Sequence, residues 1–109
     1  MAKKLTPALI EVIAERFRAL GEPTRLHILN TLRRGEHTVS ELAMATGLSQ
    51  ANLSKHLQVL LAQGFLSRRK EGLFAYYSLA DSSVFELCDL MCARLETEAA
   101  ARRQVLGRR

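Results

Sequence analysis

The stretch that decides the fold runs from residue 38 to residue 64 and reads TVSELAMATGLSQANLSKHLQVLLAQG. It opens with Thr38 and Glu41 at the spacing of a capping box, which predicts a short helix that ends at Gly47. Ser49 can cap a second, longer helix whose leucines recur at helical spacing. A short helix, a brief turn containing glycine and a longer helix with one polar side are typical of a helix-turn-helix.

The longer helix, predicted over residues 50–63, has the two faces that a DNA-reading helix needs. Its leucines would hold it on the domain, and short polar side chains in its first two turns could meet base edges in the major groove. These candidates are Ser49, Gln50, Asn52, Ser54, Lys55 and His56. An amide can bond adenine through two hydrogen bonds, so Gln50 is the first candidate for base recognition. The alternative is that they are ordinary solvated residues, and the elements on both sides of this helix favour DNA.

A change of period after this helix indicates two short strands joined by a turn that contains glycine. We therefore predict a β-hairpin, the wing, over residues 65–79. Side chains alternate along a strand, so Arg68 and Lys70 would share one side and Arg69 would take the other. At least one side of the wing could then meet a phosphate strand or the minor groove. The alternative is that these cations only protect a strand edge from aggregation.

Further helices are predicted on both sides of this unit. One covers residues 6–20, and a second opens at Pro23. A second capping box, Ser83-Val84-Phe85-Glu86, predicts a last helix that runs to about residue 103, with roughly the last six residues frayed. The order is helix, helix, helix, helix, strand, strand, helix. The fold class is therefore mainly α with a small β-hairpin, a winged helix-turn-helix in one domain over residues 1–109.

The composition excludes several classes of protein. With 109 residues, of which 48% are hydrophobic and 25% charged, the chain is expected to be one globular domain. Its 16 Lys and Arg against 11 Asp and Glu give a net charge of +5, which suits double-stranded DNA as a partner. No apolar run is long enough to span a membrane, no signal peptide is recognisable, and two cysteines make no disulfide framework, so a cytoplasmic location is expected. No phosphate loop, metal triad or nucleophile–base set is present, so we expect neither an enzyme nor a cofactor.

A winged helix can also serve as a module for protein interaction without contact to DNA. Such a module has no need of basic residues on the longer helix and on the wing. These residues therefore favour DNA binding, and a steep salt dependence of binding would distinguish the two functions.

Three stretches of the chain resemble the arsenical-repressor (ArsR/SmtB) family of bacterial winged-helix repressors. They are LGEPTRLHIL over residues 20–29, SELA with GLSQANLSKHL within residues 40–57, and the segment of residues 60–79 that contains RRKEG and YYSL. The resemblance implies a homodimer in which the first and last helices pack across a two-fold axis. It also implies repression by operator binding that is relieved when an effector is sensed.

The apolar residues of the two end helices agree with a dimer. Each helix has an apolar stripe that a domain of this size does not need for its own core. The stripes are Leu9, Val12, Ile13 and Phe17 in the first helix, and Val84, Leu87, Cys88, Met91 and Leu95 in the last. A two-fold dimer would present two recognition helices, so the operator should be an inverted repeat.

The resemblance also points to two metal sites, and neither is complete in this chain. The arsenic and cadmium site takes a Cys-x-Cys pair from the third helix, where residues 40–45 contain no cysteine. The zinc or nickel site on the last helix takes an Asp and a His near its start, and a His and an acidic residue further along. Asp81 is present, but Ser83 and Arg94 stand at the histidine positions. Arginine has no lone pair for a metal, so we expect no metal at either site.

Cys88 and Cys92 remain as a possible sensor. Their spacing puts both on one helical face, and across a two-fold axis up to four thiols could come together. Such a group could be oxidised, or could bind a soft ion or As(III). The alternative is that both cysteines are interior residues, as free cysteines often are. The effector could also be another ligand, or the protein could respond only to its own concentration.

Overall fold

The computed structural model describes residues 4–107, and its first two helices follow the local signals of the sequence. Helix α1 (Pro7–Leu20) begins where the Thr6 hydroxyl accepts a hydrogen bond from the Leu9 N–H at 3.2 Å. Helix α2 (Pro23–Leu32) follows a turn at Gly21, and its N-cap is Glu22. A proline in the first turn suits both helices, because the N–H that proline lacks has no partner there in any case.

The predicted capping box at Thr38 is confirmed, and it begins α3 (Val39–Thr46). The Thr38 hydroxyl accepts the Glu41 N–H at 3.2 Å, and the Glu41 carboxylate accepts the Thr38 N–H at 2.8 Å. Gly47 ends the helix with a φ of +76°, a conformation that costs glycine little. Helix α4 (Gln50–Ala62) follows after two further residues, so the helix-turn-helix has the predicted order.

The wing is the hairpin of β2 (Leu66–Glu71) and β3 (Phe74–Leu79). Gly72 has a φ of +61° at the first position of the two-residue turn, which favours glycine there. A third strand, β1 (His37–Thr38), was not predicted from the sequence. The antiparallel sheet has the order β1-β3-β2, with β3 in the centre. The wing is thus attached to the residues that lead into α3.

The core lies between the helix-turn-helix, α2 and the root of the wing. Its members are apolar side chains from α2, α3, α4, the sheet and the first turn of the last helix. They are Ile28, Leu29, Leu32, Leu42, Leu53, Leu57, Leu60, Leu66, Tyr77, Val84 and Phe85. No buried polar or charged residue occurs within residues 4–107, so hydrophobic burial dominates the stability of this unit.

Helix α5 (Val84–Leu106) departs from the prediction at both ends. The capping box expected at Ser83 is wrong: Ser83 has helical dihedral angles and caps nothing with its side chain. Instead, the Asp81 carboxylate accepts the Ser83 N–H at 2.7 Å, and this side chain takes the capping role. The helix also extends three residues beyond its expected end at 103. It includes Leu106, where fraying was expected, and Arg108 and Arg109 lie outside the described residues.

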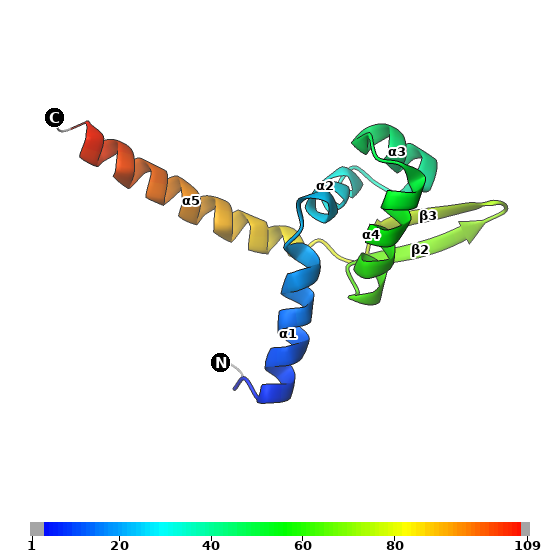
Figure 1. Cartoon of the computed structure of the whole chain (residues 1–109), viewed down its shortest axis with the longest axis horizontal. Helices are drawn as coiled ribbons and strands as arrows, with labels where there is room; N and C mark the ends of the chain where they lie inside the picture. The colour runs from blue at the N-terminus through cyan, green and yellow to red at the C-terminus, as the bar shows by residue number, and fades with distance from the viewer. Residues whose placement is uncertain (1–3, 108–109) are drawn as a thin grey trace.

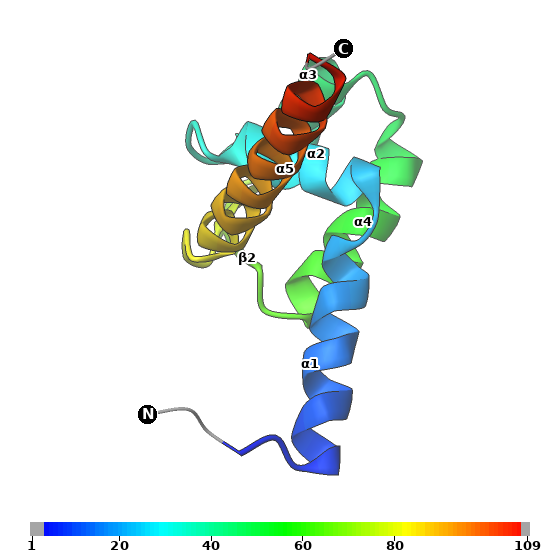
Figure 2. The ribbon, with the colours of Figure 1, turned by 90° about the vertical axis from the view of Figure 1, so that its left-hand side faces the viewer.

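Helices α1 and α5 extend from a central body, and the wing projects on the side opposite α5 (Figure 1). The view along α5 shows α1 and α5 leaving the body in different directions (Figure 2). In α5 only Val84 and Phe85 are buried, so the rest of the helix has little contact with its own chain. None of the helices in the described part of the chain is long and apolar enough to cross a membrane.

Candidate nucleic-acid interface

Helix α4 presents one face to the core and the other to solvent. Leu53, Leu57 and Leu60 are at most 1% exposed and fix the helix on the body. The helix begins at Ser49, whose hydroxyl accepts the Asn52 N–H at 3.2 Å. The positive end of the helix dipole and the remaining free N–H groups lie at this end, which suits a phosphate.

Most of the polar residues predicted on α4 are exposed. Asn52, Ser54 and Lys55 lie on the solvent side without contact to the core. Gln50 is also exposed, and its amide Nε2 donates to the Ser40 hydroxyl of α3 at 3.3 Å. This bond links the two helices of the helix-turn-helix and orients the Gln50 amide at the start of α4. An oriented amide loses less side-chain entropy when it binds a base.

Gln58 is a polar residue of the same exposed side that the sequence analysis did not include. It lies four residues after Ser54 and three after Lys55, so the three side chains are neighbours on the helix surface. The helical spacing from Lys55 would have identified it. Gln58 was missed because it lies beyond the first two turns of the helix, from which the candidates came.

His56 faces inward and differs from the other polar residues of α4. Its Nδ1 lies 3.3 Å from Oε2 of Glu22, and both atoms are buried without a well-directed hydrogen bond. The other Glu22 oxygen, Oε1, accepts the Thr24 N–H at 3.0 Å. The Thr24 N–H and then the nearby His56 hold the pKa of Glu22 below its ordinary value. His56 therefore contacts the α1–α2 junction, whereas the sequence placed it among the candidates for DNA contact.

The three cations of the wing have different surroundings. Arg68 and Lys70 are exposed, and within residues 4–107 neither forms an ion pair. Arg69 pairs with Glu36, at 2.6 Å between Nη2 and Oε1, and with Glu71. The hydrogen bonds to Glu36 and then Glu71 raise the pKa of Arg69 above its ordinary value. Two unpaired cations thus lie on one face of β2 and the paired cation on the other.

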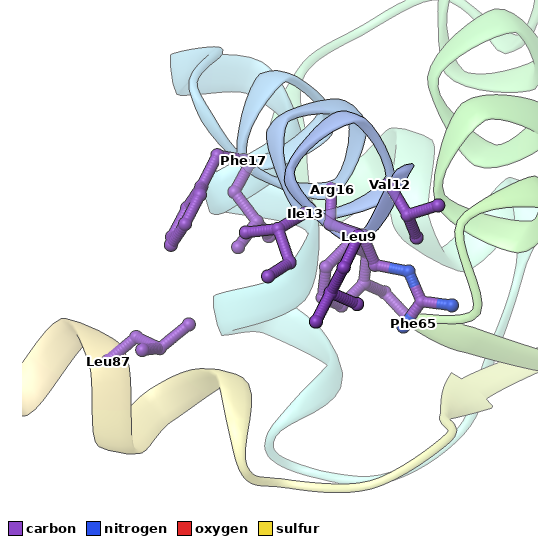
Figure 3. A pocket seen from close by; sticks show the side chains of 8 residues that line it. Leu9, Val12, Ile13, Arg16, Phe17, Phe65 and Leu87 are labelled. Carbon is purple, nitrogen blue, oxygen red and sulfur yellow. The ribbon is translucent and has the colours of Figure 1, made fainter. Parts of the chain in front are cut away.

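An open apolar groove of about 380 Å³ lies between α1 and the start of α5 (Figure 3). Leu9, Ile13 and Phe17 line it from α1, and Leu87 faces them from α5. Phe17 is 57% exposed, and along α5 Leu90 is 70% and Met91 61% exposed. Adjacent apolar side chains at this exposure usually mark an interface.

A family model described as "Bacterial regulatory protein, arsR family" matches residues 22–68, which include α2, β1, α3, α4 and the start of β2. A "Probable mercury resistance operon repressor" from Streptomyces lividans is 38% identical over 84% of this chain and 73% of its own length. This chain belongs to the ArsR family. A "Transcriptional repressor SmtB homolog" from Synechocystis is 40% identical over 69% of the chain and 57% of its own length.

A solved structure of an ArsR-type protein has the same winged fold. It is the solution structure of Mb0332 from Mycobacterium bovis, described as a homodimeric winged helix-turn-helix DNA-binding domain and a possible ArsR-family transcriptional regulator. It is 32% identical to this chain with a TM-score of 0.75, over 90% of this chain and 91% of its own. The winged helix-turn-helix predicted from the sequence is therefore confirmed as the fold of this ArsR-family protein.

The cysteines of this ArsR-family chain lie at the apolar side of α5. Cys88 is half-buried and lines a second groove together with Phe17, Leu26 and Met91. Cys92 is exposed, so at least this thiol is not an interior residue of the isolated chain. Among residues 4–107 no three His, Cys, Asp or Glu side chains gather closely enough to hold a metal ion. The expected oxygen ligand Asp81 binds the Ser83 N–H, and the hydrogen bonds from the Ser83 hydroxyl and then its N–H lower the pKa of Asp81.

Proposed function

We propose that this chain is a transcriptional repressor that binds an inverted-repeat operator as a homodimer. The observation that carries the proposal is the exposed polar side of α4, which lies on a rigid apolar base next to the free cations of the wing. Gln50, Asn52 and Ser54 would meet base edges in the major groove. Lys55, Arg68 and Lys70 would meet phosphates, and Ser49 would position the helix N-terminus.

The exposed apolar faces of α1 and α5 support pairing with a second copy. Leu87, Leu90 and Met91 of α5 contribute little to the core of their own chain. The Mycobacterium bovis relative, which matches over nine-tenths of both chains, is described as homodimeric. Two recognition helices related by a two-fold axis would enter major grooves about one helical turn, roughly 34–36 Å, apart.

Fluorescence anisotropy tests the proposal with a labelled duplex of the DNA upstream of the protein's own gene. The expected result is tight binding whose logarithm falls linearly with the logarithm of salt concentration, and weaker binding to a shuffled duplex. A duplex altered in one half-site is the matched control for the dimer. Equal, weak binding to all three duplexes would contradict operator recognition and would favour the protein-interaction module.

We also propose that release from the operator is controlled at Cys88 and Cys92. Cys88 lines the second groove and Cys92 lies one turn further along α5, so chemistry there would alter the proposed dimer surface. A disulfide between subunits requires two thiols to lose two protons and two electrons. Hydrogen peroxide accepts both and is reduced to two molecules of water. The alternative to oxidation is that the two thiolates bind a soft ion such as Hg(II) or As(III).

The same anisotropy assay separates these possibilities when the protein is reduced, treated with peroxide, or mixed with one equivalent of Hg(II). We expect peroxide to release the wild-type protein and to leave the double variant Cys88→Ser, Cys92→Ser on the DNA. Release by Hg(II) but not by peroxide would identify metal binding. Equal binding under all three conditions would exclude both thiols as the sensor.

A further inference from the structure

The side chain of Arg69 spans the whole sheet. Arg69 lies opposite Tyr76 in the pairing of β2 with β3, and Tyr76 lies opposite Thr38 in the pairing of β3 with β1. The guanidinium lies over the Tyr76 ring, with Cζ 4.6 Å from the ring centroid. From there it reaches Glu36, which directly precedes β1. One side chain on the outer strand of the wing therefore contacts the central strand and the start of the third.

The group of charges around Arg69 is acidic overall. Two carboxylates, Glu36 and Glu71, share this one guanidinium, so the group of three carries a net charge of −1. Nη2 and Nε both donate to Glu36, and Nη1 donates to Glu71. A DNA phosphate would have to displace a carboxylate to reach Arg69, whereas Arg68 and Lys70 need no such exchange.

The outer part of the wing needs a contact of this kind, because only the root of the wing, with Leu66 and Tyr77, belongs to the core. In β2 only Leu66 is buried, and every later residue of the strand is exposed. At the tip, Leu73 is 97% and Phe74 57% exposed. The position of this outer part depends on surface contacts, since hairpins have little stability alone.

Glu36 connects this contact to the helix-turn-helix. It lies two residues before Thr38, which is both the last residue of β1 and the N-cap of α3. We propose that Arg69 is a positioning residue: through Glu36 it fixes the wing relative to α3 and α4, while Arg68 and Lys70 make the phosphate contacts. The part of this inference that concerns DNA rests on the proposed function, and the contact between wing and body does not.

The first experiment measures wing order in the absence of DNA. Backbone ¹⁵N relaxation is recorded for residues 67–78 in the wild type and in Glu36→Gln, Arg69→Lys and Arg68→Lys. Lysine keeps the charge but lacks the planar fork that holds two carboxylates. We expect lower order parameters in Glu36→Gln and Arg69→Lys, and wild-type values in the matched control Arg68→Lys. Unchanged wing order in the first two variants would overturn the proposal whether or not the protein binds DNA.

The second experiment measures salt dependence of binding to the duplex from upstream of the protein's own gene. Arg68→Ala and Lys70→Ala should each reduce the slope of log affinity against log salt by about 0.9, the value for one phosphate contact. Arg69→Lys should keep the wild-type slope and weaken binding about threefold, the order expected for an exposed ion-pair network. Glu36→Gln should also weaken binding, although it makes the protein more basic.

Tighter binding with a steeper slope in Glu36→Gln would mean that Arg69 is a phosphate contact restrained by Glu36, and would overturn the proposal. Wild-type affinity in Arg69→Lys would overturn it as well. Failure of the wild type to distinguish this duplex from a shuffled one would instead contradict the proposed function. The relaxation measurement would then decide the role of Arg69 alone.

Discussion

The body of the molecule and the outer faces of α1 and α5 differ in how far they bury their apolar side chains. In the body, Leu42, Leu53 and Leu60 have no measurable exposure, whereas on α5 Leu90 is 70% exposed. The body has therefore reached a complete core with this chain alone. The outer faces of α1 and α5 leave apolar side chains exposed, and the proposed homodimer would bury them.

Leu57→Ala should have the largest effect, because it leaves a cavity among fully packed neighbours. Leu57 is 1% exposed, and such a change costs about 2–5 kcal/mol in the free energy of unfolding. Denaturant unfolding at two protein concentrations would show the same loss at both. The matched control is Leu90→Ala on α5, whose smaller effect should decline on dilution as the dimer dissociates. Equal losses in both variants at every concentration would contradict the distinction between the two regions.

Met91→Glu should break the outer region alone. Met91 is 61% exposed on the apolar side of α5, and a buried carboxylate there would oppose pairing. We expect a folded monomer in sedimentation velocity and an affinity for the upstream duplex that is lower by about 100-fold, because two linked half-sites are lost. Ala93→Glu, on the other side of the same helix, is the control. A Met91→Glu protein that remains dimeric would remove α5 from the interface.

Gln50→Ala should change the body's function without changing its fold or its pairing. We expect a loss of about 1–3 kcal/mol in binding to the upstream duplex and no loss with a shuffled duplex, if Gln50 bonds a base. Anisotropy titrations measure both values. Gln104→Ala, an exposed glutamine of α5, should change neither. Unchanged affinity and unchanged preference in Gln50→Ala would exclude Gln50 from base recognition.

Glu22→Gln tests the junction where the two regions meet and should have the smallest effect. The lowered pKa of Glu22 means that its ionised form stabilises the folded state. That stabilisation is complete above the ordinary glutamate pKa of 4.5 and is lost as the pH falls through the lowered value. The variant should therefore have a lower midpoint temperature of thermal unfolding than the wild type at pH 7, and this difference should disappear in acid. For Glu96→Gln, an exposed residue of α5, a pH-dependent deficit of the same size would contradict this explanation.

The sequence was sufficient wherever a local signal decides the structure. Thr6, Thr38 and Ser49 each cap the helix that was expected from them, since a cap involves only residues within one turn. Gly47 ends α3 for an equally local reason. Leu53, Leu57 and Leu60 of α4 are buried as their spacing predicted, and Leu61 is half-buried against the core. Local rules thus gave the helix-turn-helix and its outward polar side.

The sequence was insufficient where the partner of a residue is distant along the chain. Strand β1 exists only through its pairing with β3, and two residues carry no strand period of their own. His56 and Arg69 have the residue types of DNA contacts. In the folded chain, however, His56 lies beside Glu22 and Arg69 pairs with Glu36. At Ser83 the local rule itself failed, because the Asp81 carboxylate accepts the Ser83 N–H that the Glu86 side chain would accept in a capping box.

The position of the last buried residue has a consequence for the order of events during synthesis. All of the core cluster lies between Ile28 and Phe85, ahead of the exposed residues of α5. A chain made from its N-terminus therefore contains all of its core residues before Leu90 and Met91 are added. The proposed pairing would then join two bodies that are already folded. Assembly becomes a late step that depends on protein concentration, while folding of each body does not.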